Sequence, residues 1–203
     1  MDELSGKQPV PAILTNVESS AEDIVDLAVS RDRRNAVAEA ERLEAATDGG
    51  RLAALTGSGV QAATIARLKE RASRLARLAH NGAFVDVALA ANSVSELMPG
   101  LYGRFQNPVP AAILTLDYLD REAQFRSIAG EDKQVARAVT ELTRTWNGVR
   151  AKVVAAGGKS EATAYSRHVA AMRRLAPGAA KKVRAEAVHG LELVDQMEQV
   201  FAR

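Results

Sequence analysis

Apolar residues recur at steps of three and four along most of the chain, which is the spacing of one face of an α-helix. The most regular run lies in the second half, at Val135, Val139, Leu142, Trp146, Val149 and Val153. A similar seam in the first half comprises Ile65, Leu68, Ala72, Leu75, Ala79 and Gly82. Both seams have the period of a helix packed against other helices. The pattern therefore predicts an all-α protein.

Turn-forming residues divide this pattern into four long helices. Glycine and proline favour helix ends, so the expected stops are Asp48-Gly49-Gly50, Pro99-Gly100 and Gly157-Gly158. The helices are then expected over residues 11–47, 60–98, 110–156 and 160–203. Helices of about 40 residues would be about 60 Å long at 1.5 Å per residue. Gly130 and Pro177 interrupt the last two helices, and kinks are expected near both.

One short sequence occurs twice in the chain. The run Val10-Pro11-Ala12-Ile13-Leu14-Thr15 returns as Val109-Pro110-Ala111-Ala112-Ile113-Leu114-Thr115, with one alanine inserted. Met98 and Met197 stand at the same separation as the two prolines, Pro11 and Pro110. These matches predict an internal duplication of a helical hairpin.

Two such hairpins are expected to pack together, because one hairpin cannot cover its own apolar face. The resulting fold is an up-down-up-down four-helix bundle, a single domain over residues 1–203. Its expected parts are a loose lead-in at 1–9, a first hairpin at 10–98, a connector at 99–109 and a second hairpin at 110–203.

Composition adds little to the fold but narrows the chemistry. The 27 Lys and Arg nearly balance the 25 Asp and Glu, so the net charge of +2 creates no strong field toward nucleic acid. The chain has no cysteine, which excludes disulfides, thiolate zinc sites and cysteine nucleophiles. No apolar run approaches the roughly 20 residues of a membrane span. The interleaved glutamates and the lack of aromatics among Arg67, Arg71, Arg74 and Arg77 also argue against nucleic acid.

The segment around the second proline repeat is the most distinctive polar stretch. Its first-half counterpart lacks the aspartates, and duplicated proteins often place function where the copies diverge. The candidate ligand residues at this end of the bundle are Tyr102, Arg104, Phe105, Asp117, Tyr118, Asp120 and Arg121. The alternative is a solvated helix face with an Asp117 to Arg121 ion pair at i,i+4.

A metal site is the second hypothesis. His168 and Met172 are four residues apart on one expected helix face, a spacing that suits copper or, with Met197 from another helix, haem. Because Met172 continues a seam with Tyr165 and Val169, a core methionine beside a boundary histidine is the simpler interpretation. No Cys-x-x-Cys-His is present.

The sequence favours a binding protein over an enzyme. It has no Gly-x-Ser-x-Gly and no phosphate-cradling glycine loop. We expect a non-enzymatic bundle that binds a partner protein or small ligand near residues 102–122, without a cofactor; a homodimer and scattered acidic catalysts stay open. The chain starts without a secretory signal, from Met1 to Ser5. Because this architecture is similar to several groups of small bacterial exported bundle proteins, a periplasmic or exported location is expected, with the cytoplasm as the alternative.

Overall fold

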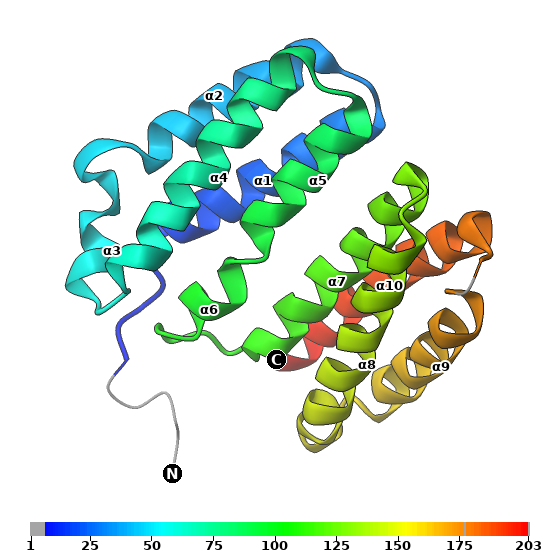
Figure 1. The fold of residues 1–203 in the computed structure, drawn as a ribbon. Helices are drawn as coiled ribbons and strands as arrows, with labels where there is room; N and C mark the ends of the chain where they lie inside the picture. The colour runs from blue at the N-terminus through cyan, green and yellow to red at the C-terminus, as the bar shows by residue number, and fades with distance from the viewer. Residues whose placement is uncertain (1–6, 177, 203) are drawn as a thin grey trace. The chain divides into compact units, whose positions relative to one another are not determined.

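A computed structural model describes residues 7–176 and 178–202. Over these ranges the chain is helical and has no β-strand; one isolated bridge joins Pro9 to Gln106. The prediction of an all-α protein is confirmed. Contacts between Cα atoms divide the chain into two compact units, residues 1–107 and 108–203 (Figure 1). The division falls inside the predicted connector, 99–109. How the two units combine into one domain stays a prediction.

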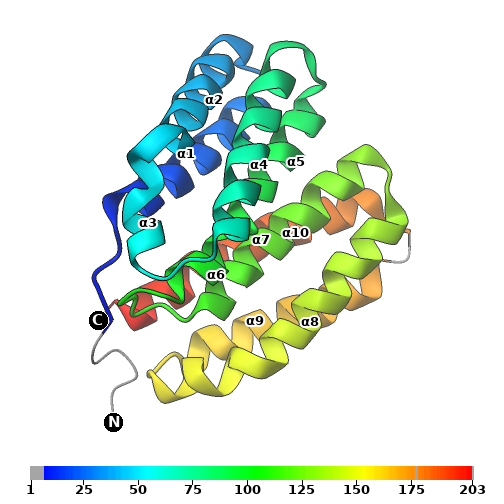
Figure 2. The same ribbon diagram turned by 60° about the vertical axis from the view of Figure 1, so that its left-hand side comes forward.

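Unit 1 contains four longer helices that pack as a closed ring. They are α1 (Ala12–Val29), α2 (Arg33–Thr47), α4 (Ala62–Asn81) and α5 (Phe84–Ser95), and each contacts the next, with α5 returning to α1. Short helices occupy the connections: η1 (Gly49–Leu52), α3 (Ala53–Gly57) and α6 (Met98–Tyr102). Figure 2 shows α1 and α2 side by side, with α4 and α5 completing the ring.

Unit 2 repeats this ring with short turns in place of short helices. Its helices are α7 (Ala111–Ala129), α8 (Asp132–Ala155), α9 (Lys159–Leu175) and α10 (Ala180–Phe201), and α10 packs back against α7. All four contribute to one core, which includes the whole seam predicted from Val135 to Val153. The largest aromatic members of this core are Trp146 and Tyr165.

The prediction of four helices of about 40 residues is wrong, because the chain reverses where a kink or a continuous helix was expected. At Gly130 (φ 74°) the backbone is left-handed, so α7 ends and α8 packs back against it. At Gly82 a Cβ would lie 2.7 Å from the carbonyl oxygen of Leu78, and the chain turns into α5. Arg31 (φ 61°) makes the same reversal after α1. Pro177, the other expected kink, lies outside the described residues, between α9 and α10.

Each predicted long helix is therefore itself a hairpin, and a single bundle of two hairpins is not confirmed. The starts of the helices nevertheless keep the spacing of the sequence repeat. The first helices begin at Ala12 and Ala111, and the second at Arg33 and Asp132, both 99 residues apart. The third and fourth pairs begin 97 and 96 residues apart. The spacing matches the units helix by helix.

Arg33 closes one of these turns in unit 1. Its guanidinium donates to the carbonyl oxygens of Ala79, His80 and Gly82 at 2.8 to 3.1 Å. At the end of α4, carbonyl oxygens have no backbone N–H of a following helical turn to accept from. It also lies 4.8 Å from the centre of the Phe84 ring, a cation–π distance. One side chain thus joins the start of α2 to the α4–α5 turn.

Replacing Arg33 with alanine is expected to lower the free energy of unfolding by about 2 kcal/mol, since it removes three charged hydrogen bonds and leaves carbonyls without their donor. The exposed neighbour Arg34 is the matched control, and Arg34→Ala should change stability by less than about 0.5 kcal/mol. Chemical denaturation followed by far-UV circular dichroism measures both. Equal losses in the two variants would show that the Arg33 contacts do not stabilise the turn.

Candidate functional site

A cluster of ionisable side chains lies inside unit 2. Asp120 on α7 accepts a hydrogen bond from the Tyr165 hydroxyl at Oδ2 (2.7 Å), and its Oδ1 lies 2.9 Å from Nε2 of His168. Both partners come from α9. The other ring nitrogen, Nδ1, lies 3.0 Å from Oε1 of Glu186 on α10. Three helices therefore meet at one histidine.

The burial of these side chains decreases along the cluster, from Asp120 and His168 to Glu186. The side chains of Asp120 and His168 are fully buried, and Tyr165 is equally inaccessible, whereas 24% of the Glu186 side chain is exposed. The cluster thus runs from the core of unit 2 to its surface. A charge without a partner at this depth would cost several kcal/mol. The hydrogen bonds between these four residues are what make the burial tolerable.

The geometry favours a protonated His168. Both ring nitrogens face carboxylate oxygens, and an ionised carboxylate only accepts, so the ring must donate twice. Burial lowers the pKa of His168, but the hydrogen bonds and charges of Asp120 and Glu186 raise it more, and the net pKa is raised. Burial raises the pKa of Asp120 against the opposing effect of His168 and Tyr165. Burial and the charge of Asp120 raise the pKa of Tyr165 well above its usual value, so its hydroxyl stays a donor.

Gly190 on α10 leaves the space that the cluster occupies. A Cβ at this position would lie 2.4 Å from Oδ2 of Asp120 and 2.6 Å from Cε1 of His168. Real Cβ atoms do not approach other atoms this closely, so glycine is required for α10 to pack against the Asp120–His168 pair. The close approach also limits the room around the imidazole.

Aromatic rings complete the walls of the cluster. Trp146 lies 4.9 Å from the Tyr165 ring centre, and its Nε1 donates to Oγ of Ser166 at 3.1 Å. On the other side, the exposed His189 approaches the His168 ring edge-on at 6.5 Å. Tyr165 and His168 themselves are 5.0 Å apart between ring centres. The imidazole is thus fixed by rings as well as by carboxylates.

This arrangement suits a structural role better than a metal site. Neither nitrogen of His168 has a free lone pair for copper or haem iron while it faces a carboxylate. Met172 and Met197, the other predicted ligands, are completely buried in the same core. Within residues 7–176 and 178–202, no group of three or more His, Cys, Asp or Glu side chains is placed to hold a metal ion.

The seven predicted ligand residues fall in different units. In unit 1, Tyr102 and Phe105 are buried, the Tyr102 hydroxyl donates to Glu18, and Arg104 is exposed. In unit 2, Asp117 and Arg121 form the ion pair at i,i+4 that the alternative interpretation predicted, at 2.8 Å. Tyr118 packs against the core, and Asp120 belongs to the buried cluster. Most of the seven thus have contacts inside their own unit.

An open groove lies along the outer side of α8 and α9. It encloses about 680 Å³, and apolar atoms make up most of its walls. We call it the α8–α9 groove. It is lined by Ala136, Val139, Thr140, Thr143, Arg144, Asn147, Arg173 and Ala176. None of them was predicted from the sequence as a binding residue, and Val139 was placed only in the apolar seam. The available signal was the charge of the segment from 132 to 175, which holds many more cations than anions.

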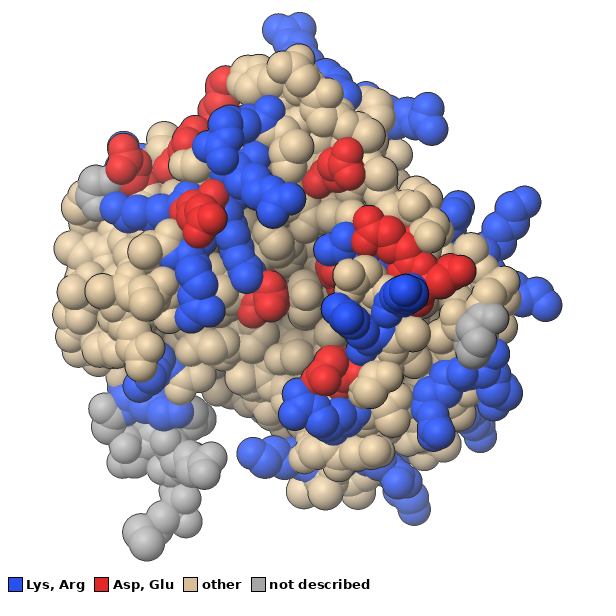
Figure 3. All heavy atoms as spheres, viewed as in Figure 1, with Lys and Arg blue, Asp and Glu red and all other residues tan. Residues whose placement is uncertain are grey.

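The charge of unit 2 is divided between its two sides. Helices α8 and α9 carry nine Lys and Arg against three Asp and Glu, whereas α7 and α10 carry five against seven. Figure 3 shows lysine and arginine side chains spread over the lower right of the view, where α8 and α9 lie in Figure 1. The positive side is therefore the side with the groove.

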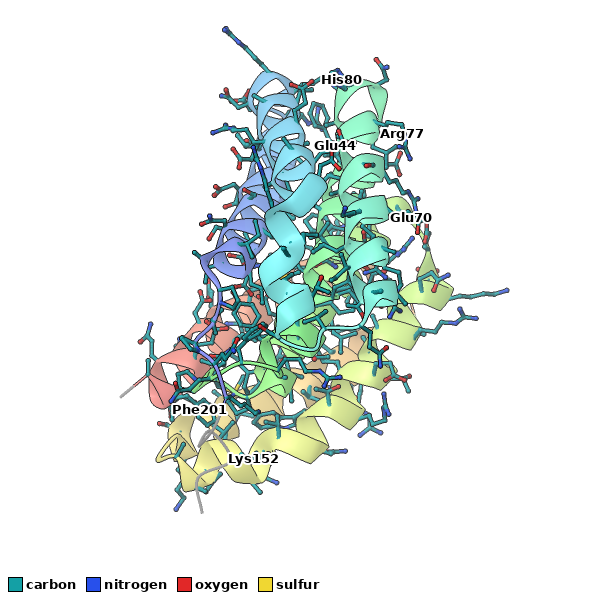
Figure 4. The ribbon with its side chains drawn as sticks, turned by 90° about the vertical axis from the view of Figure 1, so that its left-hand side faces the viewer. Glu44, Glu70, Arg77, His80, Lys152 and Phe201 are labelled. Atoms are coloured by element: carbon teal, nitrogen blue, oxygen red, sulfur yellow. The ribbon has the colours of Figure 1, made fainter. Side chains whose placement is uncertain are left out.

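The arginines of α4 in unit 1 form a different kind of surface. Arg71 pairs with Glu96 at 2.7 Å, and Figure 4 shows Glu70 and Arg77 on the outer side of the same helix. A smaller polar groove of about 380 Å³ separates α2 from α4, lined by Glu41, Glu44, Ala45, Thr47, Asp48, Lys69 and Ser73. Charges of both signs alternate here, as expected of a solvated face. The absence of nucleic-acid binding stays a prediction.

Comparisons with known proteins give no relative. No family model, no curated protein and no solved structure matches the chain. Among the helices that the structure describes, none is both long enough and apolar enough to cross a membrane. The buried cluster and the α8–α9 groove are therefore the two features that bear on function.

Substituting alanine for Gly190 is expected to destabilise unit 2 by about 1–3 kcal/mol, because the new methyl group overlaps Asp120 and His168. Gly148 is the matched control: it lies within α8, and nothing stands within 4 Å of the Cβ that it would gain. Gly148→Ala should stabilise by up to about 1 kcal/mol through helix propensity. Trp146, the one tryptophan, reports unfolding of unit 2 by fluorescence. A stabilising Gly190→Ala would contradict the close packing.

Stability is expected to fall as pH rises above about 6.5, the unfolded pKa of histidine. The folded pKa of His168 is raised, so its contribution is complete below the unfolded pKa and is lost as pH rises through the folded value. Urea denaturation from pH 6 to 9 checks this. His168→Gln should flatten the profile. Parallel profiles for the native protein and His168→Gln would exclude a stabilising imidazolium.

Proposed function

We propose that this is a non-enzymatic helical protein that binds a partner protein through the α8–α9 groove of unit 2. The observation that carries the proposal is the groove itself, an open hollow with mostly apolar walls on the positive side of the unit. Exposed apolar surface of this kind is characteristic of interaction sites. We place the binding site on the groove rather than near residues 102–122, where it was predicted, because Tyr102, Phe105 and Asp120 are buried within their own units.

The chemistry of the buried cluster supports binding over catalysis. Its one histidine is held between two carboxyl groups, and the hydroxyl of Tyr165, whose pKa is raised, donates to Asp120 and not to the histidine. A nucleophile needs a base with a free lone pair beside it. His168 offers none in this arrangement. The cluster is better suited to fixing α7, α9 and α10 relative to one another, and α9 forms one wall of the groove.

We also propose that the two units arose by duplication, each as a four-helix bundle. The matched starts of α1 with α7 and of α2 with α8 support this interpretation. At the same offset of 99 residues, Asp120 falls on Ala21, which is also fully buried. Unit 2 thus has a polar group where unit 1 has a methyl group. This divergence supports the interpretation of unit 2 as the specialised copy. The exported location of the protein stays a prediction.

A bulky residue in the groove is expected to abolish binding of a partner. A photoreactive side chain at Thr140, on the groove, should crosslink one protein in the native host, and one at Ala185, on α10, should not. The captured protein is then purified and titrated by calorimetry. Ala136→Trp should weaken its affinity at least about tenfold by filling the groove. Ala185→Trp, at another exposed alanine, is the matched control.

Two results would contradict the proposal. Unchanged affinity for Ala136→Trp, with circular dichroism showing an intact fold, would exclude the groove as the binding surface. Crosslinking at Ala185 but not at Thr140 would move the surface to α10. If the protein bound only a small molecule, and this molecule competed neither with a partner protein nor with crosslinking, the proposed partner protein would have to be replaced by a small ligand.

A further inference from the structure

The inference concerns the chemical class of the partner, and it rests on the proposed function of the α8–α9 groove. The two helices that form the groove carry nine Lys and Arg against three Asp and Glu, and the lining itself includes Arg144 and Arg173. Only Arg144 among these nine cations has an ion pair within the described residues, with Glu141 on its own helix. The surplus is therefore not neutralised inside unit 2.

The arginines that border the groove are exposed to solvent. Arg173 lines it from α9, and neither an ion pair nor a hydrogen bond holds its guanidinium in the described part of the chain. Arg144 lines it from α8, with 78% of its side chain exposed despite its pair with Glu141. Arg137 stands one turn before Glu141 on α8 and is also exposed. Cations therefore stand on both walls, and both are exposed to carboxylates of a partner.

The floor of the groove has the opposite character. Ala136, Val139 and Ala176 present methyl groups, and the lining residues of α8 extend from Ala136 to Asn147. Eleven steps of 1.5 Å give a length of about 17 Å, or about three helical turns. An apolar strip of this length, with cations along its edges, matches a helix that has one apolar face and acidic flanks.

Nucleic acid fits the groove less well. Single strands bind to aromatic side chains on which bases stack, and the eight lining residues include no aromatic ring. A phosphate backbone also gains nothing from the apolar floor. We therefore propose that the α8–α9 groove binds an acidic amphipathic helix of a partner protein, with its apolar face on Ala136, Val139 and Ala176 and its carboxylates beside Arg144 and Arg173.

Synthetic peptides test the proposal without knowledge of the natural partner. The probe is a fluorescein-labelled peptide of about four helical turns, with leucine at i, i+3, i+4 and i+7 and glutamate at most other positions. Its controls are a scrambled peptide of the same composition, a lysine version of the same pattern and a single-stranded oligonucleotide. Fluorescence anisotropy with the full chain should show saturable binding of the acidic helix alone. The binding should weaken as salt rises from about 0.05 to about 0.3 M, because added salt shortens the distance over which charges attract one another.

Charge reversal identifies the surface. Arg173→Glu and Arg144→Glu should each weaken the acidic peptide about tenfold. Arg150→Glu changes the net charge equally on an exposed arginine of α8 outside the groove lining, so its effect should stay within about twofold. Ala136→Trp should abolish binding of the acidic peptide by covering the floor. All four variants change exposed residues, and circular dichroism checks their folding.

Several outcomes would overturn the inference. Equal binding of the scrambled peptide would show that charge alone is recognised, and tighter binding of the oligonucleotide would assign the surface to nucleic acid. Equal losses for Arg150→Glu and Arg173→Glu would remove the groove from the interaction. A partner captured at Thr140 whose bound segment is not acidic would end this inference while the proposed function stands. Failure of the proposed function itself would instead appear as a partner indifferent to Ala136→Trp.

Discussion

The interior of unit 2 depends on one imidazole ring held between the carboxyl groups of Asp120 and Glu186. Replacing a buried ion pair by apolar residues is often harmless, but removing one member leaves an uncompensated charge and costs about 3–5 kcal/mol. Asp120 and His168 are therefore mutually required, whatever their net contribution. The pair also fixes other choices: Tyr165 must donate to Asp120, and Gly190 must lack a side chain. One interaction thus sets the register of α7, α9 and α10.

Periodicity predicted the buried faces of the helices, and the glycine pairs predicted the ends of α2 and α8, but the reversals at Arg31, Gly82 and Gly130 were not predicted. The seam from Val135 to Val153 is buried throughout, because its three-and-four spacing allows only one face. A glycine within a helical pattern can either kink one helix or end it where the chain reverses direction. The residues around Gly130 are compatible with both outcomes. The decision comes from tertiary packing of α7 on α8, which no local pattern encodes. Arg31 carries no turn signal at all.

The site was predicted as separate residues rather than as a cluster. Asp120 was taken as a ligand residue and His168 as a metal ligand, 48 positions apart. A local signal for burial did exist, since Asp120 continues the apolar seam of Leu116 and Ala123 on α7. A carboxylate on such a seam needs a buried partner. Which of the chain's cations supplies it depends on the pairing of α7 with α9 around the ring, and sequence spacing does not determine that pairing.

The same pairing explains why the outer side of unit 2 is positive. Residues 108–203 contain eleven Asp and Glu, and the structure commits five of them to His168, Arg121 and Arg126, namely Asp117, Asp120, Glu122, Glu131 and Glu186. None of these three cations belongs to the lining of the groove. These five carboxylates are therefore paired with cations that do not line the groove. A surface with exposed arginines around apolar atoms is stable in water, yet it can exchange that water for the carboxylates and leucines of another helix.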